Sequence, residues 1–219
     1  MHNTRILIAD NHTLLRNSIV SRLVKTPGFI IAGEVNNGRE LINKYFKLKP
    51  DIILTDVSLP LLSGIEAVKT IRRGDPAAKA LFMSMFDGDE YIYEALISGG
   101  RGLVNKSIFK DELISAIEKI NLGGTYFGPG YDQNKLNMIL KKYSSGICTE
   151  AERKICLSQS EAEFLRLLCD ALSSQEIAEK LSISRQTIEA LRGHMMLKLK
   201  VYSFSQLIRQ AVLNRILRC

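Results

Sequence analysis

Four polar residues stand at or just beyond the ends of short apolar segments, and their side chains have the chemistry of a phosphoryl-transfer site. They are Asp10, Asp56, Ser84 and Lys106. Two carboxylates that lie close together repel each other unless positive charge sits between them, and Mg²⁺ suits such a place because it prefers oxygen ligands. The metal, a lysine and a hydroxyl group would balance the charge of a phosphoryl group transferred to a carboxylate. Solvated acids and lysines at a protein surface are the alternative that these residue types alone leave open.

The elements that would position these residues alternate regularly through the first 121 residues. Short apolar runs predict strands at 5–9, 29–35, 51–55, 79–85 and 103–105. Helical spacing of apolar residues predicts helices at 12–25, 38–48, 64–73, 88–98 and 109–121. This alternation predicts an α/β fold with a parallel five-stranded sheet covered on both faces. Ligands bind at the carboxyl ends of such strands, where the four side chains converge if strands one, three, four and five are neighbours.

The pattern changes after residue 122. A glycine-rich loop, a short helix at 132–143 and a segment of Ser, Gly and charged residues read as a connection. From residue 157 onward there is no proline, and helices are predicted at 161–171, 174–181, 185–199 and 204–217. Capping boxes start two of them, at Ser158 with Glu161 and at Ser173 with Glu176. We therefore expect one domain over 1–122, a linker with a short helix over 123–156, and a small all-α domain over 157–219.

Positive charge is concentrated at the C-terminal end of the chain. The formal net charge is +7, and residues 184–219 carry seven basic side chains against one acidic side chain. A basic segment of this kind indicates a polyanion partner, although a solvated helical face has the same composition. Two helices joined by a three-residue turn, as at 174–181 and 185–199, form a helix-turn-helix. The outward stripe of the second helix, which suits the major groove of DNA, holds Arg185, Glu189, Arg192 or Gly193, and Met196.

The composition excludes several classes of protein. With 46% hydrophobic and 24% charged residues in 219, the chain is not disordered throughout. No stretch approaches the roughly 20 apolar residues that a membrane span needs, and the N-terminus does not have the form of a secretory signal. The four cysteines form no CxxC pair, and His2, His12 and His194 are too scattered to complete a zinc site. We therefore expect a cytoplasmic protein with reduced thiols and no membrane partner.

Residues 1–121 resemble the receiver domain of two-component response regulators. The segments that carry the resemblance are ILIADNH, DIILTDVSLPLLSG, LFMSMF and GLVNKS. The resemblance implies a flavodoxin-like (βα)5 fold in which Asp56 is the phosphoacceptor. It also implies that Asp10 and the backbone carbonyl of Ser58 bind Mg²⁺, and that Ser84 and Lys106 are the family's hydroxyl and lysine residues.

Three residues depart from the receiver pattern. Asn11 stands where receivers usually carry a second acid that helps to hold the metal. An amide oxygen can still be a ligand, but one charge is lost, so the affinity for Mg²⁺ should fall. Leu103 stands where receivers usually have a Tyr or Phe, and Ser107 follows Lys106 where many have a proline.

Residues 157–219 resemble the LuxR-type output domain of the NarL/FixJ subfamily. The matching segment is LSQSEAEFLRLLCDALSSQEIAEKLSISRQTIEALRGHMMLKLKVYS. The resemblance implies four helices, of which the third reads DNA and the fourth commonly dimerises. The positions that contact bases and phosphates in the family correspond to Thr187, Glu189, Ala190 and Gly193.

The two resemblances together predict a bacterial response regulator that binds double-stranded DNA at promoters and controls transcription. A partner histidine kinase would phosphorylate Asp56, and the protein would form a homodimer, at least on DNA. The alternative is a DNA-binding regulator whose atypical receiver works without phosphorylation. An enzyme is not expected, because the turn after the first strand, Asp10 to Thr13, has no glycine-rich loop that would cradle a phosphate cofactor. A pure protein-interaction module is the third interpretation, and the basic C-terminal segment disfavours it.

Overall fold

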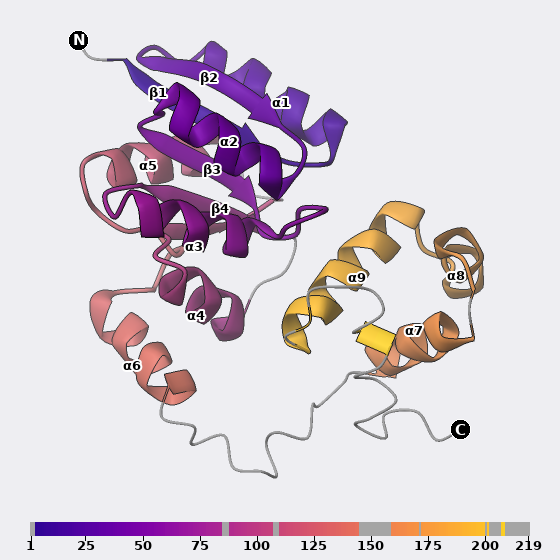
Figure 1. Ribbon diagram of the computed structural model, residues 1–219. Helices are drawn as coiled ribbons and strands as arrows, with labels where there is room; N and C mark the ends of the chain where they lie inside the picture. Colours follow the sequence, from indigo (N-terminus) through magenta and orange to yellow (C-terminus); the bar gives the residue numbers. More distant parts are fainter. Residues whose placement is uncertain are drawn as a thin grey trace. The chain divides into compact units, whose positions relative to one another are not determined.

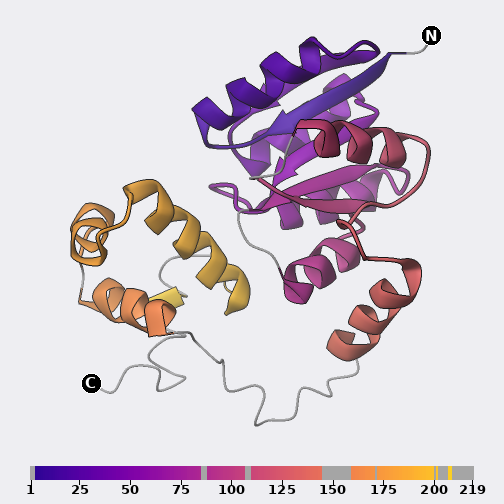
Figure 2. The ribbon, with the colours of Figure 1, turned by 180° about the vertical axis from the view of Figure 1, so that it is seen from behind.

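A computed structural model describes residues 3–84, 88–106, 110–144, 159–170, 172–199, 201 and 207–208. The chain divides into two compact units, Met1–Ile147 and Cys148–Cys219. In Figures 1 and 2 the first unit runs from indigo to salmon and the second from orange to yellow. Each unit is described by itself below.

The first unit is built on a five-stranded parallel sheet in the order β2-β1-β3-β4-β5. Its strands are β1 (Thr4–Ala9), β2 (Phe29–Val35), β3 (Ile52–Asp56), β4 (Ala80–Ser84) and β5 (Gly102–Asn105). Its helices are α1 (Thr13–Val24), α2 (Gly38–Leu48), α3 (Gly64–Gly74), α4 (Asp89–Ile97), α5 (Lys110–Asn121) and α6 (Gln133–Ser144). The α/β fold with five parallel strands that the sequence predicts is confirmed.

Helices cover both faces of the sheet, as Figures 1 and 2 show from opposite sides. Helices α1 and α5 share one apolar cluster with alternate side chains of β1, β3 and β4, including Ile6, Ile8, Leu54 and Leu81. Helices α2, α3 and α4 lie on the other face. Burial on both faces explains why the strand sequences are almost continuously apolar.

The strand register brings the predicted polar residues to one edge of the sheet. Ala9 of β1 pairs with Thr55 of β3, and Asp56 pairs with Met83 of β4. Ser84 in turn pairs with Asn105 at the end of β5. Because β1, β3, β4 and β5 are consecutive neighbours, the residues that end or follow them share this edge.

The segment after α5 belongs to the first unit. The backbone of Tyr126 exchanges hydrogen bonds with Arg101 and Leu103 (both 2.9 Å), which covers the outer edge of β5. Helix α6 packs against α4, where the rings of Tyr93 and Tyr143 stack with 5.2 Å between their centroids. The first compact unit therefore includes α6, which lies in the segment 123–156 that we expected to connect the two domains.

The second unit contains α7 (Gln159–Cys169), α8 (Ser174–Leu181) and α9 (Arg185–Lys198). Their apolar faces form one core that includes Phe164, Leu168, Ile177, Ile188 and Met195, with Leu207 buried against it. Apart from residues 207 and 208, the fourth helix predicted at 204–217 lies outside the described residues. Within the described part of the chain, no helix has both the length and the apolar character that crossing a membrane requires.

We expect the substitution Gly64→Ala to destabilise the first unit, because a methyl group there would collide with the backbone carbonyl oxygen of Asp56 and lie 2.9 Å from Thr55 Oγ1. Overpacking of this kind should lower the free energy of unfolding by about 2 kcal/mol, measured by urea denaturation. Gly74→Ala, in the last turn of the same helix, is the matched control, because the atoms nearest to its methyl group would belong to the side chain of Phe46 and not to the backbone. The control should be unchanged or stabilised by up to about 1 kcal/mol. Equal behaviour of the two variants would contradict the prediction.

Candidate functional site

The Lys106 ammonium group lies between two buried carboxylates at the carboxyl edge of the sheet. Its Nζ is 2.6 Å from Asp56 Oδ2 and 2.8 Å from Asp10 Oδ2, and the lysine side chain is only 2% exposed. The contact with Asp56 is a hydrogen bond. The contact with Asp10 is an ion pair that lacks hydrogen-bond geometry. One positive charge thus balances two like charges that would otherwise repel each other in a buried place.

His12 completes this group, which we call the carboxylate cluster (Asp10, His12, Asp56 and Lys106). The backbone N–H of His12 donates to Asp10 Oδ1 (2.7 Å), and its ring Nδ1 lies 3.0 Å from the same oxygen. The ring Nδ1 is also 3.9 Å from Asp56 Oδ2 and 3.4 Å from Lys106 Nζ. Since a carboxylate oxygen only accepts, the contact with Asp10 is a hydrogen bond in the tautomer that carries the proton on Nδ1. The sequence analysis missed His12; the available signal was its place two residues after Asp10 in the loop that follows β1.

Asp56 is held by groups on both of its oxygens. The backbone N–H of Ser58 donates to Asp56 Oδ1 (3.0 Å), while Lys106 holds Oδ2. Ser84 is buried beside them at the end of β4, and its backbone carbonyl accepts from the N–H of Lys106 (2.7 Å). The structure thus brings together Asp10, Asp56, Ser84 and Lys106, which the strand ends predicted.

The two carboxylates have different acidities. Burial raises the pKa of Asp56, and the charge of Lys106 only partly opposes this effect. Burial also acts to raise the pKa of Asp10, but hydrogen bonds from His12 and the charge of Lys106 outweigh it, so the pKa of Asp10 is lowered. Asp10 is therefore the more acidic member of the pair.

The loop between β1 and α1 is fixed from outside the cluster. Arg16 donates to the backbone carbonyl of Asp10 through Nη1 and to Glu34 Oε2 through Nε (3.1 Å). Asn11, between the two cluster residues of this loop, is exposed. Leu103 lies in β5, three residues before Lys106, and is 7% exposed. Ser107 lies outside the described residues.

The cluster offers ligands suited to a divalent cation. Asp10, His12 and Asp56 each present one ligand atom, and these atoms lie within 4.8 Å of one another. Asp10 Oδ2 is buried, and its contact is the ion pair with Lys106, with no partner in hydrogen-bond geometry. Buried carboxylate oxygens are the donors that Mg²⁺ prefers, so these residues fit such an ion.

The second unit contains the predicted helix pair. Ser173 and Glu176 form a capping box at the start of α8. Ser182 adopts the left-handed conformation in the turn, and Ser184 Oγ accepts from the N–H of Thr187 (3.1 Å) at the start of α9. Helices α8 and α9 and their short turn therefore form a helix-turn-helix.

The residues predicted on the outward stripe of α9 are not all equally exposed. Arg185 and Thr187 are exposed, whereas Glu189 accepts a hydrogen bond from Ser174 Oγ (2.8 Å) and lies 3.7 Å from Arg192 Nη1. Gly193 is half-buried, and the side chain of Ala190 lies outside the described residues.

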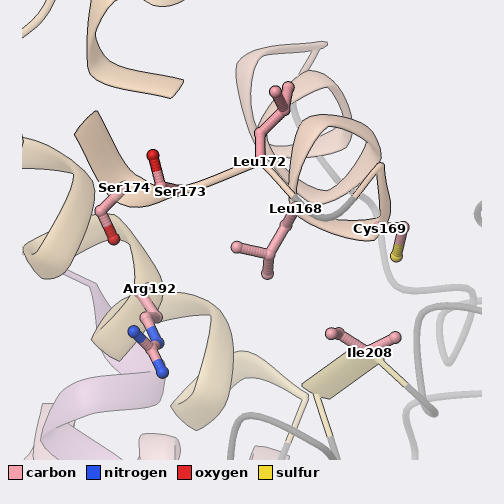
Figure 3. A pocket seen from close by; sticks show the side chains of 7 residues that line it. All are labelled: Leu168, Cys169, Leu172, Ser173, Ser174, Arg192 and Ile208. Carbon is pink, nitrogen blue, oxygen red and sulfur yellow. The ribbon is translucent and has the colours of Figure 1, made fainter. Parts of the chain in front are cut away.

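Arg192 belongs to a pocket of about 380 Å³ (Figure 3). The figure shows Ser174 and Arg192 on one side of it, with Leu168 from α7 between them and Cys169. One apolar residue differs from expectation. Met196, predicted on the outward stripe of α9, packs against the core of the second unit.

Comparison with known families gives two matches along the chain. The family model described as "Response regulator receiver domain" matches residues 6–118. The family model described as "Bacterial regulatory proteins, luxR family" matches residues 156–211. The first match spans the carboxylate cluster, and the second spans the helix-turn-helix.

Similar proteins extend over nearly the whole chain. Oxygen regulatory protein NreC of Staphylococcus aureus (strain MRSA252) is 30% identical over 214 residues, covering 97% of this chain and 99% of that protein. A LuxR-family two-component response regulator from Aurantimonas sp. SI85-9A1 is 29% identical, with a TM-score of 0.57, covering 65% of this chain and 99% of that chain.

RcsB from Salmonella enterica serovar Typhimurium, bound to a promoter in the presence of phosphomimetic BeF3−, is 26% identical with a TM-score of 0.54. That alignment covers 95% of this chain and 98% of that chain. A further structure contains two RcsB dimers bound to two parallel DNAs. It is 26% identical with a TM-score of 0.55, covering 96% of this chain and 98% of that chain.

We expect Lys106→Met to expose the repulsion between the two carboxylates in metal-free buffer. At pH 7 the free energy of unfolding should fall by about 3 kcal/mol, because two buried charges lose their counter-ion. Burial already raises the folded-state pKa of Asp56, and without the charge of Lys106 the pKa of both acids should rise. The folded variant therefore takes up a proton that the unfolded chain does not, and the deficit should shrink as the pH is lowered from 8 to 5. Urea unfolding at each pH measures this trend.

Lys69→Met is the control for this experiment. Lys69 Nζ lies 3.0 Å from Glu66 Oε1 in a solvent-accessible pair on α3. Loss of such a pair should cost less than about 1 kcal/mol. A deficit in Lys106→Met that matches the control, or that does not change with pH, would show that the cluster does not depend on the ammonium group.

Proposed function

Because the chain belongs to the response regulators that join a receiver domain to a LuxR-type DNA-binding domain, which are transcription regulators, we propose that phosphoryl transfer to Asp56 switches it. The observation that carries the proposal is the burial of Asp56 beside Asp10 with Lys106 Nζ 2.6 Å away. A buried carboxylate with one bound ammonium group is placed to accept a phosphoryl group and to share its charge.

In the transfer step, one carboxylate oxygen of Asp56 forms a bond to the phosphorus atom of the donor. The bond between phosphorus and the donor's nitrogen or acyl oxygen breaks, and its electron pair leaves with the donor. Lys106 balances charge on the phosphoryl oxygens, and the Ser84 hydroxyl group donates a hydrogen bond to one of them. Mg²⁺, held by Asp10, Asn11, Asp56 and the Ser58 carbonyl group, supplies charge neutralisation when it is bound. Asn11 contributes no charge, so we expect weak Mg²⁺ binding.

Phosphorylation shifts a population between two states of the first unit. The phosphoryl group attracts the Lys106 ammonium group away from its two carboxylates, and Ser84 moves with the end of β4. Helix α4 follows β4 along the chain and carries α6 through the stacked rings of Tyr93 and Tyr143. This packing gives a path from Asp56 to the connection that leads to the second unit.

DNA recognition falls to α9. Arg185 and Thr187 are exposed at its start, which supports contact with phosphates and base edges of the major groove. Glu189, Ala190, Arg192 and Gly193 are the further positions that the family pattern assigns to DNA. Glu189 reaches a base only if it leaves Ser174, so its contact carries an additional cost.

The partners follow from the same architecture. We propose a sensor histidine kinase as phosphodonor and a homodimer on promoter DNA in the cytoplasm. The similar protein RcsB, which has been observed as dimers on DNA, supports the dimer. In this scheme the receiver function resides in residues 1–122, residues 123–156 connect, and residues 157–219 bind DNA.

Incubation with acetyl phosphate and Mg²⁺ should add one phosphoryl group to the protein, as measured by intact mass. Asp56→Asn should abolish this addition, because an amide cannot accept the group. Asp51→Asn is the matched control, since Asp51 immediately precedes the opposite end of β3 and is exposed. A label that persists in Asp56→Asn would refute the site. If the parent protein binds its DNA equally well with and without acetyl phosphate and is never phosphorylated, the result would favour a receiver that works without phosphorylation.

For the DNA-binding helix, Arg185→Ala should weaken binding to specific and random DNA alike. If Arg185 makes one phosphate contact, the slope of log affinity against log salt should fall by about one unit. Arg166→Ala removes the same charge from an exposed position on α7 and should leave affinity and slope unchanged. Fluorescence anisotropy over a salt series provides the measurement. If the two variants show the same dependence of DNA affinity on salt, Arg185 of α9 does not contact DNA.

A further inference from the structure

We propose that the carboxylate cluster is a mixed nitrogen and oxygen metal site in which His12 Nδ1 is a ligand, so that it selects borderline divalent ions of the Co²⁺ and Zn²⁺ class over Mg²⁺. This inference rests on the metal site of the proposed function and assigns a further ligand to it. The ligand atoms come from Asp10, His12 and Asp56, which lie within 4.8 Å of one another.

The distances in the cluster fit one ion. With bonds of about 2.1 Å, adjacent ligand atoms of an octahedral site lie about 3.0 Å apart and opposite ones about 4.2 Å apart. His12 Nδ1 lies 3.0 Å from Asp10 Oδ1, which matches an edge of this octahedron. The same nitrogen lies 3.9 Å from Asp56 Oδ2, within a few tenths of an ångström of the diagonal. These two distances are compatible with a single ion that His12 shares with Asp10 and Asp56.

The position of Lys106 also marks a cation site. Its Nζ is 2.6 Å from Asp56, 2.8 Å from Asp10 and 3.4 Å from His12 Nδ1, so the ammonium group contacts the same three side chains. A metal ion entering the cluster replaces the ammonium group at these atoms and replaces the proton on His12 Nδ1. The ammonium group and the proton are thus displaced by the metal ion.

The residue types then decide which metal is preferred. Asn11 is neutral, so the cluster attracts any divalent ion with one charge fewer than a second acid would provide, and the choice between ions depends on ligand type. Mg²⁺ takes oxygen ligands and gains little from an imidazole, whereas Co²⁺ and Zn²⁺ bind imidazole nitrogen well. His12 therefore adds affinity for borderline ions only, and the ratio of the two affinities depends on this residue.

Titration calorimetry of the full chain with Co²⁺ and with Mg²⁺ tests the inference. His12→Asn retains a short side chain that can donate to Asp10 but removes the imidazole. We expect it to weaken Co²⁺ binding by about tenfold or more while Mg²⁺ binding changes much less. Asn11→Asp is the matched comparison, because a new charge should strengthen the binding of both ions. Equal losses for both ions in His12→Asn would overturn the inference.

A second measurement needs no variant. Co²⁺ bound to Nδ1 should produce a paramagnetically shifted, solvent-exchangeable imidazole N–H signal in the proton NMR spectrum of the parent protein. If bound Co²⁺ gives no such signal, His12 is not a ligand, even if acetyl phosphate and Mg²⁺ still label Asp56. If the signal is present and labelling fails, the metal site stands and the proposed switch fails.

Discussion

The interaction on which the first unit depends is the ion pairing of one buried ammonium group with two buried carboxylates. Lys106 and Asp56 are 50 residues apart in the chain, yet their charged atoms are 2.6 Å apart. An unpaired buried charge is costly, so the ends of β1, β3 and β5 cannot shift independently without exposing that cost. In the loop after β3, a Cβ atom at position 64 would collide with the carbonyl oxygen of Asp56, so the loop requires glycine there. The same ion pairs therefore hold the strand ends in place and form the chemistry of the site.

The same ion pairing makes the site switchable. A phosphoryl group on Asp56 adds negative charge next to an ammonium group that already serves two acids. We expect the lysine to weaken its contact with Asp10 when it binds the new oxygens. Hydrogen bonds from His12 and the charge of Lys106 together lower the pKa of Asp10. In the proposed switch, phosphorylation would change the balance that holds the ends of the strands, and the change would reach α4 through β4. Helix α6, stacked on α4 by Tyr93 and Tyr143, lies next along this path.

The sequence predicted the strands and helices of the first unit to within one or two residues, because apolar periodicity is a local property. It also predicted that Asp10, Asp56 and Lys106 meet, since parallel strands must end at a common edge. His12 was missed because its ring direction is set by the loop after β1 and not by spacing. The packing of α6 on α4 was missed for a related reason: the Tyr93 and Tyr143 stack joins distant segments. Glu189 and Met196 were placed on a helical wheel, whose rotation only the packed core determines.

Asn11, which stands where receivers usually carry a second acid, connects the metal site to the switch. Asp10, Asp56 and Lys106 carry one net negative charge, whereas a second acid in place of Asn11 would give two. The cluster therefore depends on a bound metal ion less than a site with three acids would, because the ammonium group of Lys106 already balances one of its two negative charges. An aspartyl phosphate carries about two negative charges where the free carboxylate carries one, so phosphorylation would add about one negative charge to this nearly balanced place and raise the demand for a metal. We therefore expect metal binding and phosphorylation to be coupled, and in our proposal the nitrogen of His12 tunes which ion supplies the missing charge.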